Sequence, residues 1–183
     1  MIVRKFKNIG RAIRLLFNFN SQISKILLET YVLFNKAKKS RVSSYAGEFE
    51  HLEKIMEKFS KKVQLVFLDF PLQGSRGVSH TVAVGGVCAD KQDKFWEYHA
   101  LAFNGQKSLN SKSPNKFAEQ LKLDLKKFES CMKDKSSTEK VELARKEGER
   151  IGVQGTPAIY INGRKVMGGI DVKSLERAIK RLL

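Results

Sequence analysis

The chain has 183 residues, of which 42% are hydrophobic, so it is long and apolar enough for one domain with a substantial core. Its formal net charge is +16, and residues 1–41 supply much of it, with ten Lys/Arg against the single acid Glu29. Basic segments of this kind suit anionic membrane surfaces or nucleic acid, but Lys-rich surfaces also arise without any partner. Charge alone therefore defines no function.

The segment RAIRLLFNFNSQISKILLETYVLF (residues 11–34) is predicted to form a basic amphipathic helix, because its apolar residues recur at helical spacing. Such a helix either packs on the fold, lies on a membrane surface or belongs to a targeting segment. Its longest apolar run, Tyr31–Phe34, is shorter than the roughly 18 residues of a membrane span. It is also shorter than the hydrophobic region of a signal peptide, which has at least about 7 residues. We therefore expect no membrane span and no clean export signal here.

A compact α/β pattern follows the charge run KAKKSR. VSSYAGEFEHLEKIMEKF (residues 42–59) predicts a helix, because its large apolar residues form one stripe. The β-branched and aromatic run from Val63 to Phe70 predicts a buried strand that Pro71 closes.

The second half is predicted to be helical up to about Gly152 and then to form a hairpin and a last helix. Ser136 and Glu139 have capping-box spacing at the start of the last helix of this block. The Asn162–Gly163 dipeptide between PAIYI and RKVMG predicts a β-hairpin. IDVKSLERAIKRLL predicts a closing amphipathic helix with Asp171 as its N-cap.

Several of these motifs carry a resemblance to a known family. GVQGTPAIYINGRKVMGG resembles the cis-proline segment of the thioredoxin superfamily. CADKQDKFWEYHALAF, followed by LKLDLKKFESCM, resembles the helical insertion of DsbA-like thiol-disulfide oxidoreductases. The resemblance covers about residues 42–183 and implies an α/β, thioredoxin-like fold with an inserted helical subdomain at about 74–150, preceded by the basic segment 1–41.

The resemblance also implies an active-site turn at the start of helix 42–59. The family has Cys-Pro-Tyr-Cys there, whereas this chain has Ser43, Ser44, Tyr45 and Ala46. A serine hydroxyl forms no disulfide and is far less acidic than a thiol, so thiol exchange at Ser43 and Ala46 is expected to be lost. Serines at this position also cap helices.

The rest of the family's substrate-binding machinery is expected to remain. Thr156 and Pro157 match the loop in which a cis prolyl bond presents main-chain groups to a bound peptide, and Tyr45 keeps its place in the turn. The resemblance therefore implies a peptide-binding groove at Tyr45, Thr156 and Pro157.

Cys88 and Cys131 are the only cysteines, and their spacing gives neither a Cys-x-x-Cys motif nor a zinc-ligand set, so no metal and no cofactor are expected. The resemblance implies that they form a structural disulfide, and hence that the protein is extracytoplasmic; two buried free thiols are the alternative. The histidines at 51, 80 and 99 show no ligand spacing and are interpreted as structural or solvated.

The N-terminal end departs from the family. A thioredoxin-like sheet needs a central strand that ends about three residues before the first cysteine position, but the apolar run in YVLFNKAKKSR ends nearly nine residues before Ser43. We therefore expect a strand that is displaced or missing, or a first 42 residues that are not the family's own N-terminus.

Three functional hypotheses follow. The first is a redox-impaired DsbA-like protein that binds a peptide or protein substrate. The second is an enzyme similar to the kappa-class glutathione transferases, whose Ser-Pro-Tyr-Ser turn resembles Ser43–Ala46 and stabilises the thiolate of glutathione. The third is a basic module that binds an anionic membrane surface or nucleic acid through residues 1–41; no specific nucleic acid is predicted.

Overall fold

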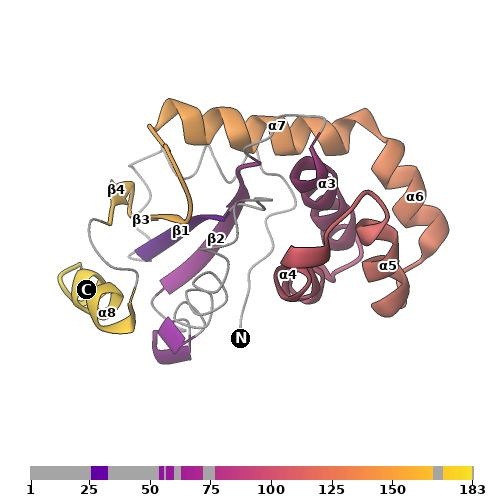
Figure 1. Cartoon of the computed structure of the whole chain (residues 1–183). Helices are drawn as coiled ribbons and strands as arrows, with labels where there is room; N and C mark the ends of the chain where they lie inside the picture. The colour runs from indigo at the N-terminus through magenta and orange to yellow at the C-terminus, as the bar shows by residue number, and fades with distance from the viewer. Residues whose placement is uncertain are drawn as a thin grey trace. The chain divides into compact units, whose positions relative to one another are not determined.

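The computed structural model describes residues 26–32, 54–55, 57–59, 63–71, 77–166 and 171–182. These residues fall into two units, a sheet unit that contains nearly all of the strand residues and the last helix, and a helical unit within residues 69–154. Figure 1 labels their elements, which are β1 (Ile26–Val32), β2 (Val63–Asp69), α3 (Val78–Asp90), α4 (Phe95–Asn104), the 3-10 turn η2 (Gln106–Ser108), α5 (Ser113–Gln120), α6 (Leu125–Lys133), α7 (Lys135–Arg150), β3 (Ala158–Ile161), β4 (Arg164–Lys165) and α8 (Val172–Lys180).

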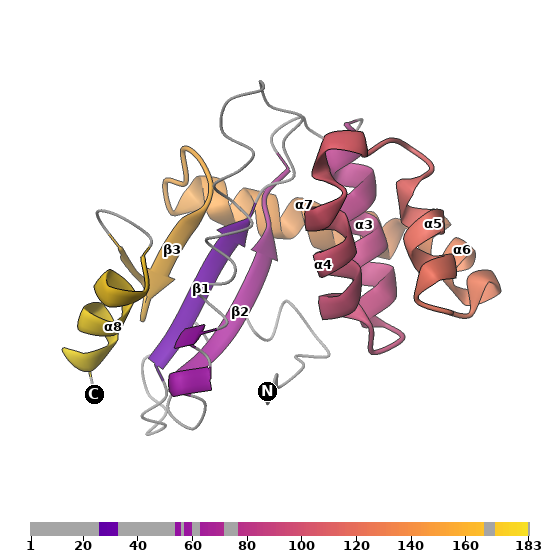
Figure 2. The same ribbon diagram turned by 60° about the horizontal axis from the view of Figure 1, so that its bottom comes forward.

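The sheet has the strand order β2-β1-β3-β4, so β1 is a central strand. It runs antiparallel to β3, with Leu28 opposite Ile161 and Tyr31 opposite Ala158, and it points the same way as β2 in Figure 2. The N-terminal segment 1–41 therefore contributes a strand to the sheet.

The helix predicted over residues 11–34 is wrong at Ile26–Val32, which forms β1. Apolar residues at helical spacing are also compatible with a strand, and Thr30, Tyr31 and Val32 have high strand propensity. Because this segment pairs with β2 on one side and with β3 on the other, it forms a strand rather than a helix. The strand that we expected to be displaced or missing is present and displaced: it ends eleven positions before Ser43. The remainder of residues 11–34 lies outside the described residues.

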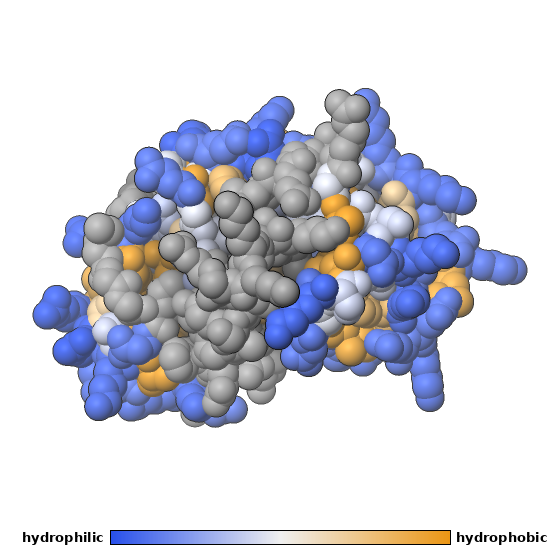
Figure 3. All heavy atoms as spheres, viewed as in Figure 1, coloured by the Kyte–Doolittle hydropathy of each residue, from blue (hydrophilic) through white to orange (hydrophobic). Residues whose placement is uncertain are grey.

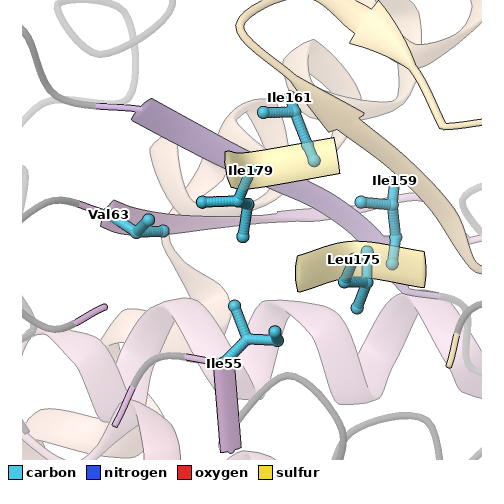
Figure 4. Packing of buried hydrophobic residues seen from close by; sticks show 6 residues of the cluster. All are labelled: Ile55, Val63, Ile159, Ile161, Leu175 and Ile179. Carbon is cyan, nitrogen blue, oxygen red and sulfur yellow. The ribbon is translucent and has the colours of Figure 1, made fainter. Parts of the chain in front are cut away.

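The core of the sheet unit lies where α8 packs on β3. Leu175 and Ile179 are fully buried, and Asp171 caps the helix by accepting a hydrogen bond from the Ser174 N–H at 3.0 Å, as predicted. Figure 4 shows the six side chains that gather in this core, which are Ile55, Val63, Ile159, Ile161, Leu175 and Ile179.

Two local predictions about strands are confirmed. The strand predicted at Val63–Phe70 is β2, and the predicted hairpin is β3–β4. Its Asn162 and Gly163 have φ angles of 51° and 76°, the left-handed values that a tight two-residue hairpin turn requires. Of the helix predicted over residues 42–59, the described residues 54–55 and 57–58 are helical, and residues 42–53 lie outside the described part.

The helical unit is built around α3. This helix contacts α4, α5, α6 and α7, and most of its residues from Ser79 to Ala89 are buried. A helix that is apolar on all sides is expected to be buried in this way. The helical block predicted from the sequence is confirmed. The capping box predicted at Ser136 is wrong, because Asp134 is the N-cap of α7 and accepts from the Ser136 N–H at 2.9 Å.

The face of the molecule drawn in Figure 3 is mainly polar where its residues are coloured. On the face drawn in Figure 3, most of the coloured side chains are hydrophilic, and apolar atoms form small separate areas. Three large apolar side chains of the described residues are exposed and lie far apart in the sequence: Leu125 begins α6, Leu143 is on α7 and Leu182 follows α8. Within the described ranges, no helix combines the length and the hydropathy needed to cross a bilayer.

Gly85 allows α4 to approach α3 closely. The Tyr98 hydroxyl donates to the Val82 carbonyl at 3.1 Å, and the ring makes an edge contact with Phe117. A Cβ atom on Gly85 would overlap the Tyr98 hydroxyl and ring, whereas a Cβ on Gly86 would lie 3.4 Å from the Phe95 ring. The two neighbouring glycines therefore differ in the space that they have.

We predict that Gly85→Ala destabilises the protein by about 1–3 kcal/mol, because the new methyl group must displace a buried tyrosine. Gly86→Ala is the matched control and is expected to be neutral or to gain up to about 1 kcal/mol of helix propensity. Urea unfolding of both variants measures the difference. Equal stability of the two would contradict the close packing of Tyr98 on Gly85.

Candidate functional site

The loop before β3 carries the two described residues of the predicted binding groove. The peptide bond between Thr156 and Pro157 is cis. Both residues are partly exposed, whereas Ala158–Ile161 directly after them is buried. Pairing with β1 and a hydrogen bond from the Val166 N–H to the Ile159 carbonyl at 2.8 Å hold the strand that follows. The loop is thus fixed at one end of a strand inside the sheet.

The turn that the resemblance assigned as the active site lies outside the described residues. This applies to Ser43, Tyr45 and Ala46 alike. Their roles stay predictions, and the described geometry brings together only the Thr156–Pro157 part of the groove.

Cys88 and Cys131 form a disulfide, as the resemblance implied. Their Cα atoms are 5.7 Å apart, and the bridge joins α3 to α6 across 43 sequence positions. A loop of this length corresponds to a stabilisation of roughly 4 kcal/mol in the chain-entropy treatment of cross-links. The bridge therefore fastens the central helix of the helical unit to one of its neighbours.

Polar groups surround the Cys131 end of this bridge. The Ser137 hydroxyl lies 3.2 Å from the Cys131 sulfur and accepts a hydrogen bond from the Lys91 ammonium at 3.1 Å. The same ammonium lies 3.5 Å from a carboxylate oxygen of Asp134. Ser137 is fully buried, whereas Lys91 and Asp134 reach the solvent.

Asp69 is the last residue of β2, belongs to the helical unit and interacts electrostatically with Tyr98 of the same unit. Burial raises the pKa of the Asp69 carboxyl to about 7. Burial also raises the pKa of the Tyr98 hydroxyl, and the negative charge of Asp69 adds to that rise. Asp69 retains some exposed surface, but its neighbourhood disfavours the ionised carboxylate.

The histidines of the helical unit are buried, which fits their interpretation as structural residues. Burial lowers the pKa of His99 to about 3, and its ring packs on Phe103 with centroids 4.3 Å apart. Burial likewise lowers the pKa of His80, although Nε2 of that ring lies 3.2 Å from the Glu142 carboxylate. His51 lies outside the described residues. No group of three His, Cys, Asp or Glu suited to a metal ion occurs in the described part of the chain.

Sequence reasoning missed three of these polar groups. Asp69 had a signal, since it is an acid at the end of the apolar run VQLVFL. Lys91 and Ser137 had none, because they are 46 positions apart and meet only through the packing of α7 beside α3.

Comparison with known proteins places these features in a family. The profile of the family described as Thioredoxin matches residues 46–181. A probable disulfide bond formation protein D from Bacillus anthracis is 30% identical over 129 residues, which are 67% of this chain and 58% of that protein. The Na(+)/H(+) antiporter NhaA 3 of Salinispora tropica is 26% identical over 135 residues, which are 74% of this chain and 21% of the antiporter. The chain thus spans less than two thirds of either relative.

A solved structure agrees in fold. The thiol-disulfide exchange protein alpha-DsbA2 from Wolbachia pipientis superposes with a TM-score of 0.72 at 17% identity, covering 96% of this chain and 94% of that one. The chain belongs to the thioredoxin family and, within it, to the DsbA-like thiol-disulfide oxidoreductases. The predicted thioredoxin-like fold with a helical insertion is confirmed.

Asp69 gives a pH-dependent prediction. Because its folded pKa of about 7 exceeds the ordinary 3.8, the folded state binds the proton more tightly, and stability falls as the pH rises from about 4 to about 7. Asp69→Asn removes this titration. We expect it to stabilise the protein at pH 8, by at most about 4 kcal/mol from three pKa units, and to change little at pH 4. Urea unfolding at the two pH values measures this.

Asp171→Asn is the control for that experiment. Hydrogen bonds from Ser174 lower the pKa of the Asp171 carboxyl, so its linkage has the opposite sign and the substitution should give no gain at pH 8. If Asp69→Asn instead weakens the fold equally at both pH values, the ionisation of Asp69 does not affect stability and the prediction is wrong.

Proposed function

We propose that this chain is an exported DsbA-like protein that binds protein or peptide substrates beside Thr156 and Pro157 without catalysing thiol exchange at the family's active-site turn. The observation that carries the proposal is the sequence of that turn, in which Ser43 and Ala46 stand at the positions of the two cysteines. The correspondence rests on the sequence resemblance, because the family profile matches residues 46–181 and so begins only at the last residue of the turn.

The chemistry of the family depends on sulfur. A thiolate at the first position attacks a disulfide, and the second cysteine resolves the mixed intermediate. A helix N-terminus favours a nearby anion by at most about 2 kcal/mol, which is too little to make the Ser43 hydroxyl an effective thiolate substitute. Ala46 has no group that resolves an intermediate. The turn therefore supports neither half of the exchange reaction.

Substrate binding makes no such demand on sulfur. The Thr156–Pro157 loop is partly exposed, and the strand that it precedes is anchored by β1 and by the core of α8. A loop with a fixed main chain binds an extended peptide at a lower entropic cost than a mobile one. Tyr45 completes the proposed groove.

Export is proposed on the basis of the Cys88–Cys131 disulfide, because such bonds persist mainly in oxidising compartments. The Bacillus anthracis relative, named as a probable disulfide bond formation protein, is in keeping with this. The relatives that act on disulfides favour the DsbA-like hypothesis over the kappa-class alternative with Ser43 as its active group. Membrane binding through residues 1–41 has no support and stays a prediction.

The test of lost exchange uses two added cysteines. We expect the wild-type protein not to accelerate insulin reduction above the uncatalysed rate. The Ser43→Cys, Ala46→Cys double variant should accelerate it, because Cys-x-x-Cys pairs at helix N-termini in general lie within disulfide reach. Neither single variant should be active.

The matched control is Ser44→Cys with Gly47→Cys, which has the same spacing shifted by one residue. Activity of this control equal to that of the 43/46 pair would contradict the assignment of the turn. Wild-type turnover at even a few per cent of the double variant would contradict the proposed loss of activity.

The test of retained binding uses an unfolded protein whose thiols are blocked by carboxymethylation. Thr156→Arg should abolish its binding to the wild-type chain, since a bulky charged side chain at the partly exposed loop obstructs the proposed groove. Gln154→Arg adds the same charge at a neighbouring exposed position and should leave binding intact. Circular dichroism checks that both variants fold. Equal binding of the two variants, or none by the wild type, would contradict the groove.

A further inference from the structure

The Cys88–Cys131 bridge is asymmetric, because a directed chain of hydrogen bonds ends on only one of its sulfur atoms. A lysine ammonium has donors but no acceptor, so Lys91 must donate to the Ser137 hydroxyl. A disulfide sulfur carries no hydrogen, so Ser137 must donate its own proton to the Cys131 sulfur. The series of hydrogen bonds therefore runs from the Lys91 Nζ through the Ser137 Oγ to the Cys131 Sγ.

This arrangement is suited to a thiolate at Cys131. In the reduced protein the Ser137 hydroxyl would donate to a negatively charged sulfur, and charge-assisted hydrogen bonds are stronger than neutral ones. The ammonium behind it polarises the hydroxyl and adds positive potential. Ser137 is fully buried, so water does not compete for its proton.

Two groups oppose this effect. The Asp134 carboxylate lies 3.5 Å from the Lys91 ammonium and reduces its positive potential, but Asp134 also accepts hydrogen bonds from Ser136, which lower the pKa of its carboxyl, and the Lys91 Nζ still donates to Ser137 at 3.1 Å. Cys131 belongs to the last turn of α6, where the helix dipole disfavours an anion. The dipole effect is weakened by the basic Lys133 in the same turn.

Cys88 has a different environment. It is 1% exposed, against 8% for Cys131, and lies on the central helix α3, where Val84 precedes it by one turn and buried residues flank it in the sequence. Apolar surroundings disfavour its thiolate. Both cysteines are buried, but they differ in exposed fraction and in the polar contact that Ser137 makes to the Cys131 sulfur.

We propose that Cys131 is the nucleophilic thiol of this pair and the residue through which the reduced protein exchanges with external disulfides. The Cys131 thiolate attacks one sulfur of a small disulfide such as oxidised glutathione, forming a mixed disulfide and releasing one glutathione thiolate. The Cys88 thiolate then attacks the Cys131 sulfur, closing the bridge and releasing the second. The protein dithiol loses two electrons to the glutathione disulfide, and the two released thiolates take up the two protons.

The step uses Lys91 as a positioning residue, because it acts on the sulfur through Ser137. It does not depend on the proposed function, since it involves neither Ser43 nor Ala46. The reaction forms one disulfide per protein molecule and does not turn over insulin. The insulin and binding experiments of the proposed function and the thiol experiments below can therefore fail or succeed independently.

The first experiment compares the two thiols one at a time in the folded protein. Cys88→Ser leaves Cys131 free, and Cys131→Ser leaves Cys88 free; each is alkylated with iodoacetamide between pH 5 and 10. We expect Cys131 to titrate below the ordinary thiol value of about 8.5 and to react at least about tenfold faster than Cys88 at pH 7, a ratio that a one-unit lower pKa produces. After unfolding in urea the two should react alike.

The hydrogen-bond chain is tested in the Cys88→Ser background. Lys91→Met and Ser137→Ala should each raise the apparent pKa of Cys131. Lys133→Met removes a nearby lysine that takes no part in these hydrogen bonds, and it should shift the pKa less. A Cys131 pKa at or above 8.5, or one that Lys91→Met does not change, would overturn the proposal.

A second measurement needs no variant. Reduced wild-type protein is mixed with oxidised glutathione, quenched with acid at early times and mapped by mass spectrometry. Glutathione on Cys131 is expected, and glutathione on Cys88 or in equal amounts on both would overturn the proposal even if the single-cysteine variants fail to fold.

Discussion

The pairing of β1 with β3 is the interaction on which the sheet unit depends. Strand β1 fills the position between β2 and β3, so that without it both neighbours would expose an unpaired edge. The register that sets Tyr31 opposite Ala158 also fixes the start of β3, directly after Thr156 and Pro157. Ile159 and Ile161 of the same strand carry the core against which α8 packs. The sheet, the loop and the last helix thus share one strand pair.

This arrangement separates the fold of the family from its chemistry. The sheet order, the core and the disulfide depend on backbone pairing, on apolar packing and on Cys88 and Cys131. None of them requires sulfur at residues 43 and 46. The two cysteines of this sequence are joined in the bridge between α3 and α6. Ser137 and Lys91 lie at the Cys131 end of that bridge, whereas Cys88 is buried on α3.

The sequence predicted those parts of the structure whose signals are local. Val63–Asp69, the turn at Asn162–Gly163 and the capping of α8 by Asp171 each depend on a few adjacent residues. Strand β1 was mispredicted because its partner in β3 lies about 130 positions away. The spacing of apolar residues within residues 11–34 carries no information about pairing at that distance. The disulfide followed from the resemblance alone. The contact between Lys91 and Ser137 depends on how elements pack, so neither the spacing nor the composition of the chain could indicate it. The burial of Asp69 had only a weak signal, its place at the end of an apolar run.

Amide hydrogen exchange on β1 and β3 tests the central claim that residues 26–32 supply the central strand. In the wild-type protein the amides of residues 28–31 and 159–161 should be protected together, because the two strands bond to one another. Thr30→Pro removes one donor from the middle of β1 and should abolish protection in both segments. The account is contradicted if residues 28–31 exchange as fast as an unfolded chain while residues 159–161 stay protected, since the sheet would then hold β3 without β1.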